Sequence, residues 1–90
     1  MNKVEELEGI LLSIASKVVD SPQSLIIISE EKESKILFVL STKCKGEIGQ
    51  LIGEKGNIAN SFRVLLRAAS KRIQSKEVAL VVTPEIETEF

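Results

Sequence analysis

The chain has 90 residues, 43% of them hydrophobic and 28% charged, with a formal net charge of −1. This length supplies a single domain, and the apolar content excludes a disordered chain. No apolar run approaches the roughly 20 residues of a membrane helix, and the N-terminus carries no secretory signal, so we expect a cytoplasmic protein without membrane contact.

The first half of the chain predicts a helix followed by a hairpin. Apolar residues recur at spacings of three and four at Val4, Leu7, Leu11, Ile14 and Val18. This pattern is typical of an amphipathic helix, which we expect to end at residues 20–22 because Pro22 cannot continue it. The apolar runs 25–29 and 35–41 predict two strands. The polar residues 30–34 between them predict the turn of a hairpin.

The second half predicts two more helices and a third strand. Residues 46–52 favour a short helix, and residues 53–56 break the chain. Asn57 is expected to cap a long helix over residues 58–74. The expected inner face of that helix consists of Ile58, Phe62, Leu65, Ala69 and Ile73. Residues 78–83 predict the last strand.

These elements follow one another as helix, strand, strand, helix, helix, strand. We therefore predict an α+β fold in which three helices cover one face of a three-stranded sheet, because that arrangement buries every apolar stripe. A single domain is expected over residues 1–84, where Pro84 closes the last strand. Residues 85–90 form an acidic C-terminal tail.

The charges are distributed unevenly along the chain. Residues 41–76 carry eight basic and two acidic side chains, whereas the segments on either side are net acidic. Arg63, Arg67 and Lys71 follow one another at four-residue steps, so they share one face of the long helix. This pattern indicates either an anion-binding face or a solvated helix surface.

A glycine-bracketed dipeptide, Gly53-Glu54-Lys55-Gly56, separates the two later helices. Glycine reaches backbone angles closed to other residues and allows another backbone to approach closely. The second glycine precedes a helix, whose unpaired N–H groups and dipole favour a phosphate. Lys55 adds a positive charge at the tip, and Glu54 opposes it. A plain helix–helix corner is the alternative interpretation of the same four residues.

At this motif the sequence resembles a known family. Leu51-Ile52-Gly53-Glu54-Lys55-Gly56 is similar to the KH-domain signature, an apolar pair followed by G-x-x-G. Residues 57–69 resemble the small bacterial KhpA-type KH proteins, which share G-x-I-A-x-x-[aliphatic or Phe]-R before an alanine-rich stretch. Gly46-Glu47-Ile48-Gly49 also resembles the family's approach to the loop. The resemblance covers essentially the whole chain and implies the type II KH fold.

The resemblance implies a cleft that binds about four unpaired nucleotides of single-stranded RNA. The implied clamp is Gly53, Glu54, Lys55 and Gly56, followed by Asn57. The implied apolar floor is Ile48, Ile52 and Ile58, which would equally be core residues in any such fold. Arg63 would contact phosphate or support the turn, and Lys43 and Lys45 would contact phosphate. The expected role is that of an RNA chaperone or post-transcriptional regulator. Glu54 departs from the usual basic loop dipeptide, which would weaken affinity.

Other classes of function fit the sequence less well. The chain has no His and one Cys, so it lacks an imidazole base, an internal disulfide and a recognisable metal site. We therefore expect no enzyme activity, no metal and no cofactor. The alternative is a protein-interaction module, because the KhpA-type resemblance implies a homodimer or pairing with a larger KH-domain protein of the Jag type. Such systems are tied to bacterial cell shape.

Overall fold

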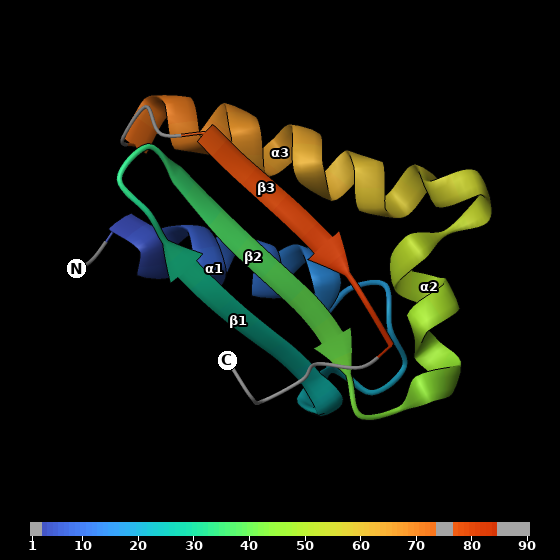
Figure 1. Ribbon diagram of the computed structural model, residues 1–90. Coiled ribbons are helices and arrows are strands. Elements are labelled where there is room, and N and C mark those ends of the chain that lie inside the picture. Colours follow the sequence, from blue (N-terminus) through green and yellow to red (C-terminus); the bar gives the residue numbers. More distant parts are fainter. Residues whose placement is uncertain (1–2, 74–76, 85–90) are drawn as a thin grey trace.

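The computed structural model describes residues 3–73 and 77–84, without the side chain of Ile73. The helices and strands of this part are α1 (Lys3–Ala15), β1 (Leu25–Glu31), β2 (Lys35–Thr42), α2 (Ile48–Ile52), α3 (Asn57–Ile73) and β3 (Glu77–Val82). This order confirms the predicted αββααβ arrangement (Figure 1). The predicted end of the long helix at Gln74 and the acidic tail lie outside the described residues.

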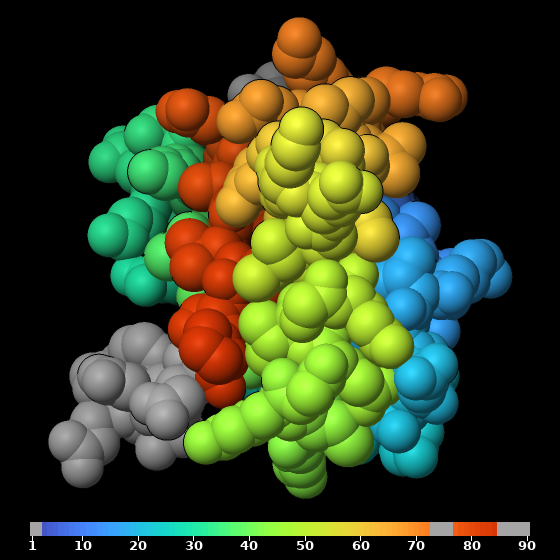
Figure 2. Space-filling model, turned by 90° about the vertical axis from the view of Figure 1, so that its right-hand side faces the viewer, coloured from blue at the N-terminus to red at the C-terminus, as the bar shows by residue number. Residues whose placement is uncertain are grey.

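The three strands form one mixed sheet in the order β1-β2-β3. β1 pairs with β2 antiparallel, as the predicted hairpin requires, and β2 pairs with β3 in parallel. The parallel pair needs a crossover connection, which α2 and α3 provide. Seen from the side in Figure 2, the strands form one layer and the helices the other. β1 and β3 are therefore the two edges of the sheet.

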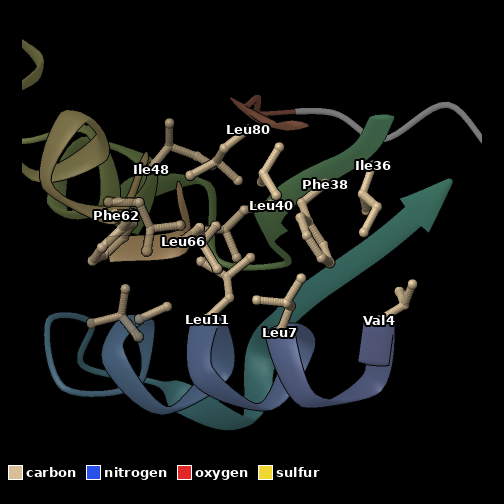
Figure 3. Close-up of a cluster of buried hydrophobic side chains, with 14 residues drawn as sticks. Val4, Leu7, Leu11, Ile36, Phe38, Leu40, Ile48, Phe62, Leu66 and Leu80 are labelled. Atoms are coloured by element: carbon tan, nitrogen blue, oxygen red, sulfur yellow. The ribbon is translucent and has the colours of Figure 1, made fainter. Parts of the chain in front are cut away.

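The core lies between the inner face of the sheet and the helices. Alternate residues of β2, namely Ile36, Phe38 and Leu40, are fully buried, as the two-residue period of a strand predicts. Leu7 and Leu11 of α1 point toward them (Figure 3). Complete burial of side chains of this size stabilises the fold by roughly 1.5–3 kcal/mol each.

The structure corrects the predicted end of the first helix. α1 ends at Ala15, not at residues 20–22. Two tight i→i−3 hydrogen bonds follow, from Lys17 N–H to the Ile14 carbonyl (3.2 Å) and from Val18 N–H to the Ala15 carbonyl (3.1 Å). This turn redirects the chain so that Val19 is buried in the core. Pro22 begins a 3₁₀ turn and does not terminate α1.

The inner face of α3 also differs from the prediction. Leu66 is fully buried, whereas Leu65, which the apolar pattern places in the core, is 49% exposed. Consecutive residues lie about 100° apart around a helix, so only one of the two can point at the sheet. The buried positions are Ala59, Phe62, Leu66 and Ser70. The prediction followed apolar character alone and missed Ser70, a small polar residue that completes the buried face.

Candidate nucleic-acid interface

The turn between α2 and α3 consists of Gly53, Glu54, Lys55 and Gly56. Three of these residues have positive φ angles: 75° at Gly53, 56° at Lys55 and 78° at Gly56. A side chain at Gly53 would place its Cβ 2.6 Å from Cγ1 of Ile58, whereas a Cβ at Gly56 would meet nothing within 4 Å. The first glycine is therefore required by packing and backbone angle together, and the second by backbone angle alone.

The tip of this turn presents unpaired backbone donors to solvent. Gly56 N–H donates to the Gly53 carbonyl (3.1 Å), and Asn57 N–H donates to the Glu54 carbonyl. Within the described part of the chain, no acceptor pairs with the amides of Glu54 and Lys55, and both side chains are exposed. The turn lies at the N-terminal end of α3 (Figure 1) and carries these two amides and the exposed side chains of Glu54 and Lys55.

α2 is held in place by polar contacts to the segment after α1. Glu47 is 7% exposed, and its Oε1 accepts a hydrogen bond from Ser21 N–H at 2.6 Å. Gln50 donates through Nε2 to Asp20 Oδ2 (3.1 Å) and accepts from Asp20 N–H (3.2 Å). These contacts anchor a helix of only five residues, which is too short to be stable alone. Sequence reasoning missed both roles.

The three isoleucines of the predicted floor are not equivalent. Ile48 is 8% exposed and belongs to the core. Ile52 and Ile58 are partly buried, so each packs on the core and keeps an accessible surface. Asn57 has helical angles (φ −62°, ψ −37°) and an exposed side chain, so it lies inside α3 and does not cap it. The residue that turns the chain into α3 is Gly56.

Arg63 links α3 to the outer edge of β3. Its Nε donates to the Leu80 carbonyl (3.1 Å), and its Nη1 donates to Asn60 Oδ1 (2.7 Å). The guanidinium is half-buried, and its planar fork matches two acceptors that lie in different directions. These two bonds fix α3 against the edge strand, while the expected phosphate contact of Arg63, or its support of the turn, stays a prediction.

Replacing Arg63 by lysine should destabilise the fold by about 1 kcal/mol. An ammonium group cannot reproduce the pair of bonds to Leu80 and Asn60, and a typical hydrogen bond contributes about 1 kcal/mol. Urea denaturation measures the change. The matched control is Arg67→Lys on the same helix, where the side chain is exposed and an effect below about 0.5 kcal/mol is expected. Equal effects at the two positions would contradict the supporting role.

Lys43 and Lys45 lie apart from the loop. Both side chains are in the segment before α2, whereas Lys55 follows α2. The two groups of predicted phosphate contacts therefore lie at opposite ends of α2 (Figure 1). A ligand touching all three lysines would have to pass along α2.

One surface along α3 was not predicted as a site, although Asn57 at one end of it is a predicted RNA contact. A depression of about 540 Å³ begins at Asn57 and follows the outer face of α3. Its lining residues are Asn57, Asn60, Ser61, Val64 and Leu65. Val64 and Leu65 are 62% and 49% exposed. The sequence does contain a signal for this surface, namely the adjacent apolar residues Val64, Leu65 and Leu66. A helix that packs on one sheet cannot bury all three, so some of them must be exposed.

Two kinds of feature are absent from residues 3–73 and 77–84. No helix there is long and apolar enough to cross a membrane. No group of three or more His, Cys, Asp or Glu side chains there is arranged to hold a metal ion.

A mixed three-stranded sheet, three helices on one face and a G-x-x-G turn between the last two helices define a type II KH domain. A family model described as KhpA/KhpB, KH domain, matches residues 8–82. The chain therefore belongs to the KhpA/KhpB family of KH domains. This membership agrees with the expectation that the protein is not an enzyme.

Two relatives support this assignment, and a solved structure supports the fold. The chain is 33% identical over 70 residues to "RNA-binding protein KhpA" of Listeria monocytogenes, covering 78% of this chain and 91% of the relative. It is 34% identical over 74 residues to the protein of the same name from Bacillus subtilis, covering 78% and 90%. A crystal structure of a point variant of Aquifex aeolicus Era, bound to GDP and AlF4⁻, matches with a TM-score of 0.64 at 18% identity. That match covers 84% of this chain and 30% of Era, so it supports the fold alone.

Proposed function

We propose that the protein binds single-stranded RNA at the turn between α2 and α3, in the cytoplasm. The observation that carries the proposal is the exposed Gly53–Gly56 turn with two unpaired amides and Lys55 at its tip. Backbone amides in a turn with left-handed residues, next to a helix N-terminus, form a concave site for an anionic oxygen. The relatives in the same family are named RNA-binding proteins, which supports RNA as the source of the phosphate.

The nucleotides would pass between the helices and the edge of β3. The helix side supplies Ile52 and Ile58, whose accessible apolar surface suits unstacked bases. Arg63 fixes the distance between the two sides through its bond to Leu80. Because this path uses backbone and apolar contacts, it should discriminate weakly among bases, which suits an RNA chaperone or a post-transcriptional regulator with many target RNAs.

Binding should be weak and strongly dependent on salt. Three or four phosphate contacts predict a slope of roughly −2 to −3 for log K against log salt concentration, from about 0.7 counterions released per contact. Titration of a fluorescent single-stranded RNA from low to moderate salt measures this slope. A binding constant that does not change with salt, or no binding at low salt, would contradict the proposal.

A second candidate function is favoured by Val64 and Leu65. Two large apolar side chains exposed at adjacent positions of α3 suit a protein contact. The occupant would be a second copy of the chain or a larger KH-domain protein of the Jag type.

Replacing both Val64 and Leu65 by glutamate tests this second function. The double variant should stay folded, because both side chains are exposed, and should abolish any dimer seen by light scattering at micromolar concentration. The monomer has a mass of 9.9 kDa. A wild-type sample that scatters as a monomer would argue against self-association, and a dimer that survives in the double variant would place the contact elsewhere.

A further inference from the structure

The sheet has a second edge, on the side away from the candidate RNA path. β1 forms this edge, with β2 on its inner side only. In an antiparallel pair, the residues of a strand alternate between bonding the neighbour and pointing their N–H and C=O groups away from it. The hydrogen bonds from Lys43 N–H to the Ser24 carbonyl and from Lys32 N–H to the Lys35 carbonyl fix which residues bond inward. They are the even-numbered residues of β1.

The outward-pointing backbone groups therefore belong to the odd-numbered residues. Ile27 lies opposite Leu40, and Ser29 lies opposite Phe38, in the pairs that do not exchange hydrogen bonds. The N–H and C=O groups of Ile27 and Ser29 thus face away from the sheet. Within the described residues, no other backbone group bonds to them. Such an edge is a template for another strand.

A groove lies beside the same residues. It encloses about 360 Å³ between α1 and β1 and is lined by Glu5, Glu8, Gly9, Leu12, Leu25 and Ile27. A Cβ added at Gly9 would meet nothing within 4 Å, so the groove is open at this residue. Leu12 is 46% exposed on its wall. Every second side chain of an added strand would point into this groove, and the others would point to the opposite face of the sheet, as a strand's two-residue period requires.

The acidic charge of the groove favours a basic ligand over a second copy of the chain. Both of its charged lining residues, Glu5 and Glu8, are acidic, and Glu8 accepts a hydrogen bond from the hydroxyl of Ser29 on β1. A second copy pairing through the same edge would bring two sets of these carboxylates together, because a two-fold contact joins identical surfaces. Basic side chains on an incoming strand would instead be attracted.

We propose that the β1 edge and the α1–β1 groove bind an extended segment of a partner protein in which every second side chain faces the groove, and these groove-facing side chains are apolar at one end of the segment and basic at the other. The segment adds a fourth strand next to β1, bonds to the backbone of Ile27 and Ser29, places apolar side chains against Leu12, and places basic side chains beside Glu5. This edge is separated from β3 by the width of the sheet, so the segment and RNA bind at the same time.

The probe is a synthetic seven-residue peptide with the sequence Thr-Val-Thr-Val-Thr-Lys-Thr, acetylated and amidated at its ends, so that two valines and one lysine at alternate positions face the groove. Its binding is measured by fluorescence anisotropy, and the exchange of individual amides by NMR. At saturating peptide, the amides of Ile27 and Ser29 should become at least about tenfold more protected from exchange, because each gains a hydrogen bond. A control peptide with proline at the central valine should not bind.

Two charge-reversal variants on one turn of α1 distinguish peptide binding in the groove from a general electrostatic attraction to the helix. Glu5→Lys should weaken peptide binding roughly fivefold, because one attraction becomes a repulsion. Glu6→Lys changes the same charge at an exposed neighbouring position that does not line the groove, and binding should stay within about twofold.

Three results would overturn the proposal. They are the absence of peptide binding, equal binding to Glu5→Lys and Glu6→Lys, and concentration-dependent protection of Ile27 and Ser29 without peptide, which would assign the edge to a second copy.

Discussion

Replacing Lys55 and Gly56 by aspartate is expected to reduce RNA affinity roughly a hundredfold while leaving the fold intact. Lys55 loses a charge-assisted contact to phosphate, which contributes about 1.5–3 kcal/mol, and two carboxylates join Glu54 at the tip of the turn. Gly56 has open space around its Cβ position, so an aspartate there meets no clash. Its φ of 78° costs about 1 kcal/mol for a side chain that tolerates left-handed angles comparatively well.

The matched control carries the same substitutions away from the loop. Gly9→Asp and Lys17→Asp together change the net charge by the same amount, and a Cβ at Gly9 also meets nothing. RNA affinity in this control should stay within about threefold of the wild type. Circular dichroism and anisotropy titration are measured on both variants. Retained affinity in a folded Lys55→Asp, Gly56→Asp protein would favour the protein-interaction function.

The largest stability effect is expected at Gly53. Replacing it by alanine should lower the free energy of unfolding by ~3 kcal/mol and the melting temperature by roughly 15 °C. The added Cβ would lie 2.6 Å from Cγ1 and 2.9 Å from the backbone N of Ile58, and the backbone angles of φ 75° and ψ 172° are open essentially to glycine alone.

Gly56→Ala is the matched comparison for Gly53→Ala. It shares a positive φ angle but has no neighbour within 4 Å of the new Cβ, so its cost should be about 1 kcal/mol. Urea denaturation of the two variants gives the difference directly. If the two substitutions lower the free energy of unfolding equally, the close packing of Ile58 against Gly53 does not contribute to the stability of the turn.

The order of elements was predictable from the sequence because each element carries a local signal. Periodic apolar residues marked α1, the two apolar runs marked the hairpin, and glycines marked the turn before α3. Ends of helices were less predictable. α1 ends at Ala15 because the following turn buries Val19, and a tertiary contact of that kind leaves no trace in the local pattern.

In the candidate site, the features set by adjacent residues were predictable, and the contacts between distant residues were not. The G-x-x-G turn could be found from four adjacent letters, and Arg63 from its place in the family run. Leu80, which accepts the hydrogen bond from Arg63, lies 17 residues further along the chain. Glu47 and Gln50 form hydrogen bonds with Ser21 and Asp20, which lie 26 and 30 residues earlier in the chain. Such pairs depend on the packing of α2 against the segment after α1, so only the folded chain reveals them.

RNA is expected to contact this protein at the Gly53–Gly56 turn. NMR titration of the isotope-labelled chain with a short single-stranded RNA tests it most directly. We expect the largest changes in amide chemical shift at Glu54, Lys55, Gly56 and Ile58, and no change at the β1 edge. Shifts centred on Ile27 and Ser29, or no shifts at low salt and excess RNA, would contradict it.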